Sequence, residues 1–173
     1  MLKDIYNSAY FEYLQSNNKK AEAFEMMYTE YCKGNQSDFV KSGIENSIVY
    51  FHDQAGMEEN DVSLYDSLVA KYPKLMDFDR FLYNRCQAVI SSARNAFLNK
   101  NVEEGERLLK KFDSDGYYSA SRPAYCNPGE VYSLAGSYYF KKNNLSKARA
   151  SIKKGLTYDP GNWELNQKLK ELQ

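Results

Sequence analysis

The chain has 173 residues, of which 43% are hydrophobic and 27% charged, a composition typical of a soluble globular protein with a sizeable core. Its 23 basic residues equal its 23 acidic ones, so the sequence lacks the basic excess of a general nucleic-acid binder. No apolar run approaches membrane-spanning length, and we expect a single domain over residues 1–173 without membrane insertion.

Hydrophobic periodicity predicts helices throughout the first half of the chain. In a helix over 2–14, the residues on one face are Leu2, Ile5, Ala9 and Tyr13. A second helix runs to about Tyr31, with Ala21, Phe24, Tyr28 and Tyr31 facing inward. A third follows to about His52, capped by Ser37 and carrying Val40, Ile44, Ile48 and Phe51. A short helix with Leu64, Leu68 and Tyr72 closes at Pro73.

A long helix starts at Asp77 or Asp79 and reaches Phe97. The turn Asn99-Lys100-Asn101 leads into a return helix over 102–112, and the segment from there to Pro128 is irregular. Two short amphipathic helices over 129–160 follow, joined by the turn Lys142-Asn143-Asn144. A final helix over 162–172 places Leu165, Leu169 and Leu172 on one face and would cap the preceding hairpin.

The stretch 129–160 resembles a tetratricopeptide repeat. The slots of the family pattern are filled by Tyr132, Ala135 with Gly136, Tyr139, Ala148, Ile152, Gly155 and Pro160. Gly136 and Ala148 are small where two helices would cross closely. The resemblance implies an all-α superhelix, or solenoid, and it covers about the last 45 residues of the chain.

The turns indicate an internal period. Asn17, Asn101 and Asn144 each precede a small residue by four positions, and they lie 84 and 43 residues apart. A missing turn is then expected near residue 59. The chain would hold about four helical hairpins and a C-terminal capping helix, the earlier repeats being degenerate.

Sites for chemistry are sparse. His52 is the one histidine and lies at a predicted helix end, where it would interact with free carbonyl groups. The three cysteines, Cys32, Cys86 and Cys126, are far apart and show no disulfide framework or metal-ligand spacing. We therefore expect no enzyme, metal or cofactor, and a reducing compartment such as the cytoplasm, unless a signal peptide or flanking domain has been removed.

The charge is uneven. Residues 38–79 hold nine acidic and three basic residues, whereas residues 129–173 hold four acidic and eight basic ones. Head-to-tail association into a homo-oligomer would use this asymmetry, although a solvated surface is its commoner origin.

The resemblance implies a groove lined by the first helix of each hairpin. In the last repeat this row would be Glu130, Ser133, Ser137, Phe140 and Lys141, and in the preceding hairpin Gln87, Ile90, Arg94, Phe97 and Leu98. The alternative is that Phe97 or Phe140 packs against the next hairpin. We expect a non-catalytic scaffold or regulatory module that binds a peptide or protein partner on this concave face. A helical sensor of a small ligand is the second hypothesis.

Overall fold

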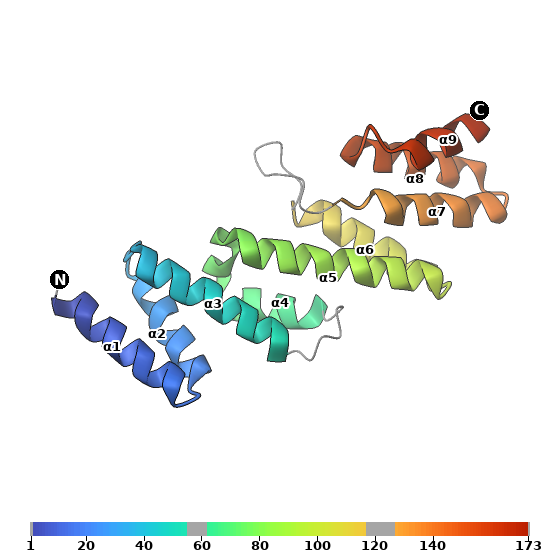
Figure 1. The fold of residues 1–173 in the computed structure, drawn as a ribbon. Coiled ribbons are helices and arrows are strands. Elements are labelled where there is room, and N and C mark those ends of the chain that lie inside the picture. Colours follow the sequence, from blue (N-terminus) through green and yellow to red (C-terminus); the bar gives the residue numbers. More distant parts are fainter. Residues whose placement is uncertain (1, 55–61, 117–126, 173) are drawn as a thin grey trace. The chain divides into compact units, whose positions relative to one another are not determined.

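The computed structural model describes residues 2–54, 62–116 and 127–172, with side chains for 7–49, 62–116 and 127–172. These residues form nine α-helices and one short 3-10 helix, and they contain no strand (Figure 1). The elements are α1 (Leu2–Ser16), α2 (Lys20–Cys32), α3 (Asp38–Gln54), α4 (Val62–Lys71), η1 (Pro73–Asp77), α5 (Asp79–Leu98), α6 (Val102–Ser114), α7 (Gly129–Lys141), α8 (Leu145–Tyr158) and α9 (Trp163–Glu171). The all-helical prediction is confirmed for this part of the chain.

Helices that follow one another in the sequence pack against one another. Such pairs are α1 with α2, α2 with α3, α7 with α8 and α8 with α9. The chain divides into two compact units, one of residues 1–58 and 66–81 and the other of residues 59–65 and 82–173. The expected turn near residue 59 lies outside the described residues.

The first unit is built on the contact between α2 and α3. Phe24, Met27 and Ile44 are fully buried there. A Cβ atom at Gly43 would lie 2.9 Å from the Met27 Cγ atom, so the glycine lets the two helices approach. Ser37 accepts the Val40 amide at 3.4 Å and caps α3 as predicted.

The predicted inner face of α1 is wrong where the structure describes it. Ala9 and Tyr13 are exposed, whereas Leu14 is buried. Apolar residues lie all round this helix, because Tyr10 and Phe11 also fall on other faces. The position of α2, rather than the spacing within α1, therefore decides which residues are buried.

The second unit has two core clusters. One joins α5, α6 and α7, and its largest members include Phe97, Leu108 and Phe112. The other joins α7, α8 and α9 through Tyr139, Ile152 and Leu165. The capping role expected of the last helix is consistent with Leu165, which is fully buried.

Three hairpins share one turn. The middle residue has a positive φ in each: 57° at Asn18, 62° at Lys100 and 57° at Asn143. The next amide donates to the carbonyl five residues back at 2.8 Å in all three, as in a Schellman motif: Lys19 to Leu14, Asn101 to Ala96 and Asn144 to Tyr139. The same local turn geometry thus recurs at these three positions.

The shared turn corrects the register predicted for the first hairpin. Lys19, not Asn17, occupies the position that Asn101 and Asn144 hold before the next helix. The buried small residue four positions later is Ala23, which is 0% exposed, whereas Ala21 is exposed. The prediction failed because the asparagine of the first turn lies at a different place in the motif.

The cysteines also differ from expectation. Cys86 is disulfide-bonded, and Cys32 is free and exposed. Cys126 lies outside the described residues. The expectation that no disulfide forms is therefore wrong at Cys86. Disulfides are typical of oxidising compartments, so this bond gives no support to the cytoplasmic assignment.

Candidate functional site

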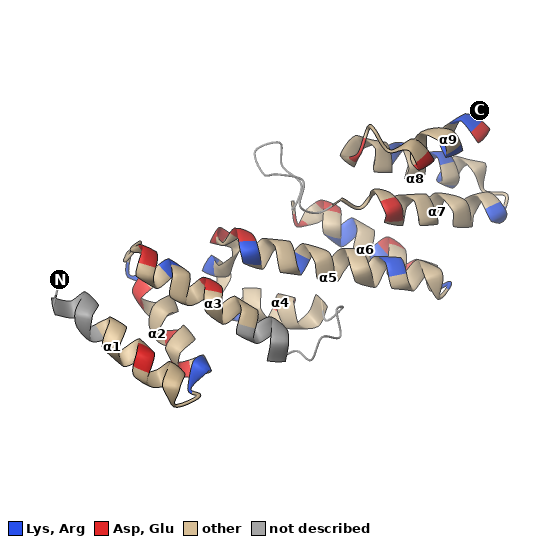
Figure 2. Ribbon diagram, in the orientation of Figure 1, with Lys and Arg blue, Asp and Glu red and all other residues tan. Residues whose placement is uncertain are grey.

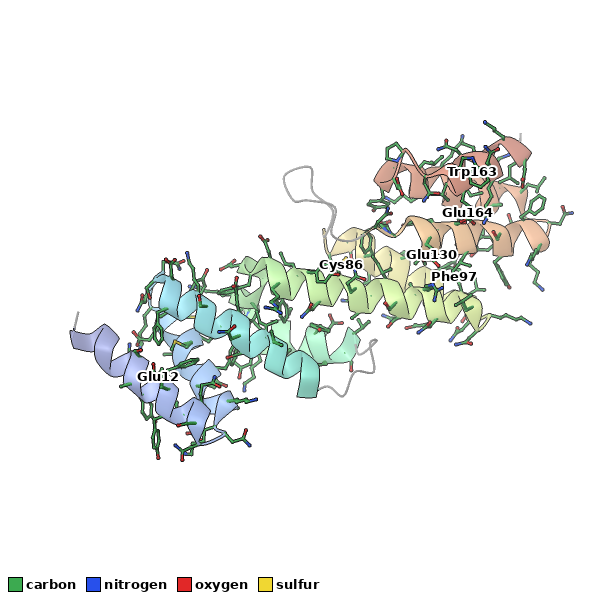
Figure 3. All side chains as sticks on the ribbon, in the orientation of Figure 1. Glu12, Cys86, Phe97, Glu130, Trp163 and Glu164 are labelled. Carbon is green, nitrogen blue, oxygen red and sulfur yellow. The ribbon has the colours of Figure 1, made fainter. Side chains whose placement is uncertain are left out.

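Polar contacts connect α5, α7 and α9, of which the sequence places α5 and α7 on the groove and α9 as the capping helix. The Arg94 Nε atom donates to Glu130 Oε1 at 2.8 Å and links α5 to α7. The Ser133 hydroxyl donates to Glu164 Oε1 at 2.7 Å, and Lys168 Nζ donates to the Ser133 oxygen at 2.6 Å. Glu130 and Glu164 are labelled in Figure 3 on their two helices. We call the surface formed by α5, α7 and α9 the odd-helix face.

These contacts occupy part of the predicted row. Ser133 is only 2% exposed, because α9 covers it. The Lys168 ammonium and the Ser133 hydroxyl lower the pKa of the Glu164 carboxyl, so this anion is stabilised within the molecule. Arg94 and Glu130 form an ion pair with each other at the surface. The polar side chains Glu130 and Ser133 in the first half of α7 are therefore already bonded to other residues of the chain.

The second half of α7 is different. Ser137, Phe140 and Lys141 line a pocket of about 140 Å³ together with Lys168, Glu171 and Leu172 from the C-terminal end of the chain. Gly136 and Ile152 complete its wall. Phe140 is 50% exposed, and Lys141 is exposed and enters no ion pair among the described residues. We call this the α7–α9 pocket.

The two phenylalanines of the predicted row have opposite environments. Phe97 is 6% exposed and packs over Gly105, where a Cβ atom would lie 2.7 Å from its ring. Phe140 stands eight residues before Ala148, just as Phe97 stands eight before Gly105. Since a Cβ atom at Gly105 would clash with the Phe97 ring, we infer that the Cβ atom of Ala148 prevents Phe140 from packing in the same way. Phe97 is a core residue and is not accessible to a partner.

The remaining residues of the row belong to α5. Gln87 is half-buried, and Ile90 is half-buried against the α5–α6–α7 core. Leu98 is 51% exposed at the end of the helix. The structure therefore brings Ser137, Phe140 and Lys141 together in one pocket and leaves the α5 residues outside it.

Sequence reasoning missed a second pocket, of about 250 Å³, between α6, α7 and α8. One end holds Glu106, which accepts from the Tyr139 hydroxyl and, at 3.1 Å, from Lys147 Nζ. The other end holds Asp113, which accepts from Tyr132 and Tyr158 and pairs with Lys154. We call these two clusters tyrosine clasps.

A spacing of seven is the signal that could have found the clasps. Three pairs of residues are each seven positions apart: Glu106 and Asp113 on α6, Tyr132 and Tyr139 on α7, and Lys147 and Lys154 on α8. Residues with this spacing lie on the same face of a helix. Both carboxylates are already bonded within the molecule, so this pocket offers no spare anion to a ligand.

The described residues offer little for catalysis or metal binding. They contain no group of three or more histidine, cysteine, aspartate or glutamate side chains placed to hold a metal ion. The side chain of His52 lies outside the described residues, and Cys32 is an exposed thiol. Within the same described ranges, no helix has the length and apolar character needed to cross a bilayer.

The chain was compared with protein-family models, curated proteins and solved structures. No family model, no curated protein and no solved structure matches it.

Proposed function

We propose that this chain is a non-catalytic binding module whose odd-helix face holds a peptide or a segment of a partner protein. The observation that carries the proposal is the α7–α9 pocket, where an exposed aromatic ring and a lysine with no ion-pair partner in the described part of the chain stand beside an open apolar cavity. Exposed aromatic and charged side chains around a small pocket are the usual anchors of peptide recognition.

A tetratricopeptide-like superhelix is the architecture we propose for the hairpins. The common turn at Asn18, Lys100 and Asn143 supports it, because the same local geometry recurs along the chain. The close approach of α7 and α8 supports it as well. A Cβ atom at Gly136 would lie 2.6 Å from Ile152 Cγ1, as expected for the small residue of a tight helix crossing.

A small-ligand sensor is less well supported. The two pockets described above have volumes of about 140 and 250 Å³ and both open to solvent. Sites for drug-sized ligands enclose about 300–1,000 Å³ and bury most of the ligand. A polypeptide that lies across the face and inserts single side chains makes better use of such shallow sites.

The proposal is tested with peptides selected from a phage-displayed random library on the full chain. Arg94→Glu reverses a charge on the odd-helix face, and Arg107→Glu on α6 is its matched control. Each arginine lies in an exposed pair, Arg94 with Glu130 and Arg107 with Glu104. Since exposed pairs contribute about 0–1 kcal/mol, both variants should remain folded.

We expect the selected peptides to bind the Arg94→Glu variant about tenfold or more weakly and the Arg107→Glu variant as tightly as wild type. Fluorescence anisotropy measures both affinities. Equal affinities for the two variants would show that binding does not extend to Arg94 on α5, and a library from which no peptide is enriched would count against a peptide-binding function.

A further inference from the structure

The α7–α9 pocket has the size of a single bulky side chain. Its volume of about 140 Å³ is close to that of an engineered apolar cavity of about 150 Å³ that accommodates benzene. Apolar groups of Gly136, Phe140, Ile152 and Leu172 form its walls. Ile152 and Leu172 are almost fully buried, so this part of the wall is held by the core.

The rim of the pocket is polar, and its charge is unbalanced. Lys141 and Lys168 face one acidic residue, Glu171. Lys168 is paired with Glu164 and bonds Ser133, which fixes its position at the edge and offsets its charge, so the net positive charge of the rim rests on Lys141. Lys141 has no ion-pair partner among the described residues and is available to a ligand.

The segment that supplies most of the pocket has the same sign. Residues 129–173 hold eight basic and four acidic residues, a net charge of +4. Figure 2 shows the lysines and arginines along α8 and at the end of α7. Such a surface attracts negatively charged chains and repels basic ones.

We propose that the α7–α9 pocket receives one bulky apolar side chain, aromatic or branched, from an acidic segment of a partner protein. Lys141 then pairs with a carboxylate beside that side chain, while Phe140 packs against the inserted group. The inference rests on the proposed function and adds to it the position and the chemistry of the anchor.

The test uses synthetic fluorescent peptides and the full chain. The first peptide has one phenylalanine flanked on both sides by aspartate and glutamate. In the second, alanine replaces the phenylalanine, and in the third, lysines replace the acids. Phe140→Ala and Lys141→Glu are the pocket variants. Leu145→Ala and Lys142→Glu are their controls, since Leu145 and Lys142 are exposed nearby and do not line the pocket.

We expect the acidic phenylalanine peptide to bind tightest. Its affinity should fall about tenfold or more in the alanine peptide and in the Phe140→Ala variant, the effect of leaving one such side chain unburied. Lys141→Glu should weaken binding about threefold or more and reduce its salt dependence. Both control variants should bind like wild type.

Three results would overturn the inference. Equal binding of the acidic and lysine peptides, or unchanged binding in both pocket variants, would remove the proposed anchor. If the library peptides still required Arg94, the odd-helix face would remain the binding surface and only the pocket assignment would fail. Self-association in analytical ultracentrifugation that disappears in the Phe140→Ala variant would identify a second copy, not an acidic partner, as the occupant.

Discussion

At the scale of residues, the tyrosines serve as links between helices. The chain has 16 of them, and several place a ring in the core and a hydroxyl on a carboxylate of another helix. Tyr139 bonds Glu106, and Lys147 lies 4.8 Å above the Tyr139 ring. In the first unit Tyr72 bonds Glu25 in the same way, with Lys71 at 4.7 Å from its ring. These tyrosines therefore pack between helices and also form partly buried hydrogen bonds with carboxylates.

The clasp at Glu106 predicts a dependence of stability on pH. The Tyr139 hydroxyl and then Lys147 lower the pKa of the Glu106 carboxyl, so its contribution is complete above the ordinary glutamate value of about 4.3. That contribution is lost as the pH falls through the lower value of the folded state. Burial and the Glu106 carboxylate raise the pKa of Tyr139 to about 12. The tyrosine's contribution is complete below about pH 10 and is lost as the pH rises through 12.

Glu106→Gln removes the charge from this clasp. Because Glu106 is partly exposed and solvent screens its pairs, we expect a loss of only about 1 kcal/mol at neutral pH, or about 2–4 °C in melting temperature. Circular dichroism melting curves at a series of pH values measure it, with Glu103→Gln on the same helix as the control. The difference from wild type should narrow below about pH 4. A difference that stays constant down to strongly acidic pH would contradict this assignment.

At the scale of elements, glycine positions set how closely paired helices approach. Gly105 on α6 lies directly under the Phe97 ring of α5, with the space for a Cβ atom only 2.7 Å from that ring. Alanine there would favour the helix by about 1 kcal/mol in isolation. The clash should outweigh this gain, because the ring is buried and overpacked cores lose about 1–3 kcal/mol.

We therefore expect Gly105→Ala to destabilise the chain in urea unfolding, even though it replaces a glycine within a helix. Gly116→Ala is a poor control, because Gly116 has a positive φ of 64°. Gly161→Ala is suitable, since a Cβ atom there meets nothing within 4 Å. If Gly105→Ala were as stable as wild type, the explanation for the different burial of Phe97 and Phe140 would not hold.

Element boundaries followed from the sequence where local chemistry sets them. Asn101 and Asn144 cap the helices after their turns by accepting the Glu104 and Lys147 amides, and the sequence placed both turns correctly. The residues that face the core were harder to predict. Apolar groups lie on several faces of α1, and the packing of α2 against it decides which of them are buried.

The candidate site was partly predictable. The family spacing selected Ser137, Phe140 and Lys141, which do line one pocket. It also selected Phe97, whose burial depends on a glycine of the opposite helix. The contribution of Lys168 and Glu171 depends on how α9 lies against α7, which no spacing within α7 specifies.

At the scale of the whole molecule, charge is distributed unevenly along the chain. Residues 38–79 carry a net charge of −6, and residues 129–173 carry +4. Lys141 and Lys168 line the α7–α9 pocket. Hydrogen bonds connect α5 to α7 and α7 to α9. We therefore propose that a partner binds one face of the second unit, through a single apolar anchor and the lysines beside it.

Chemical-shift mapping by NMR tests this placement most directly. The full ¹⁵N-labelled chain is titrated with the acidic phenylalanine peptide. The account predicts that the largest shifts cluster on Ser137, Phe140, Lys141, Lys168 and Leu172, with smaller ones along α5 at Arg94. Shifts concentrated instead on Lys110, Ser151 and Lys154, at the pocket between α6, α7 and α8, would contradict it.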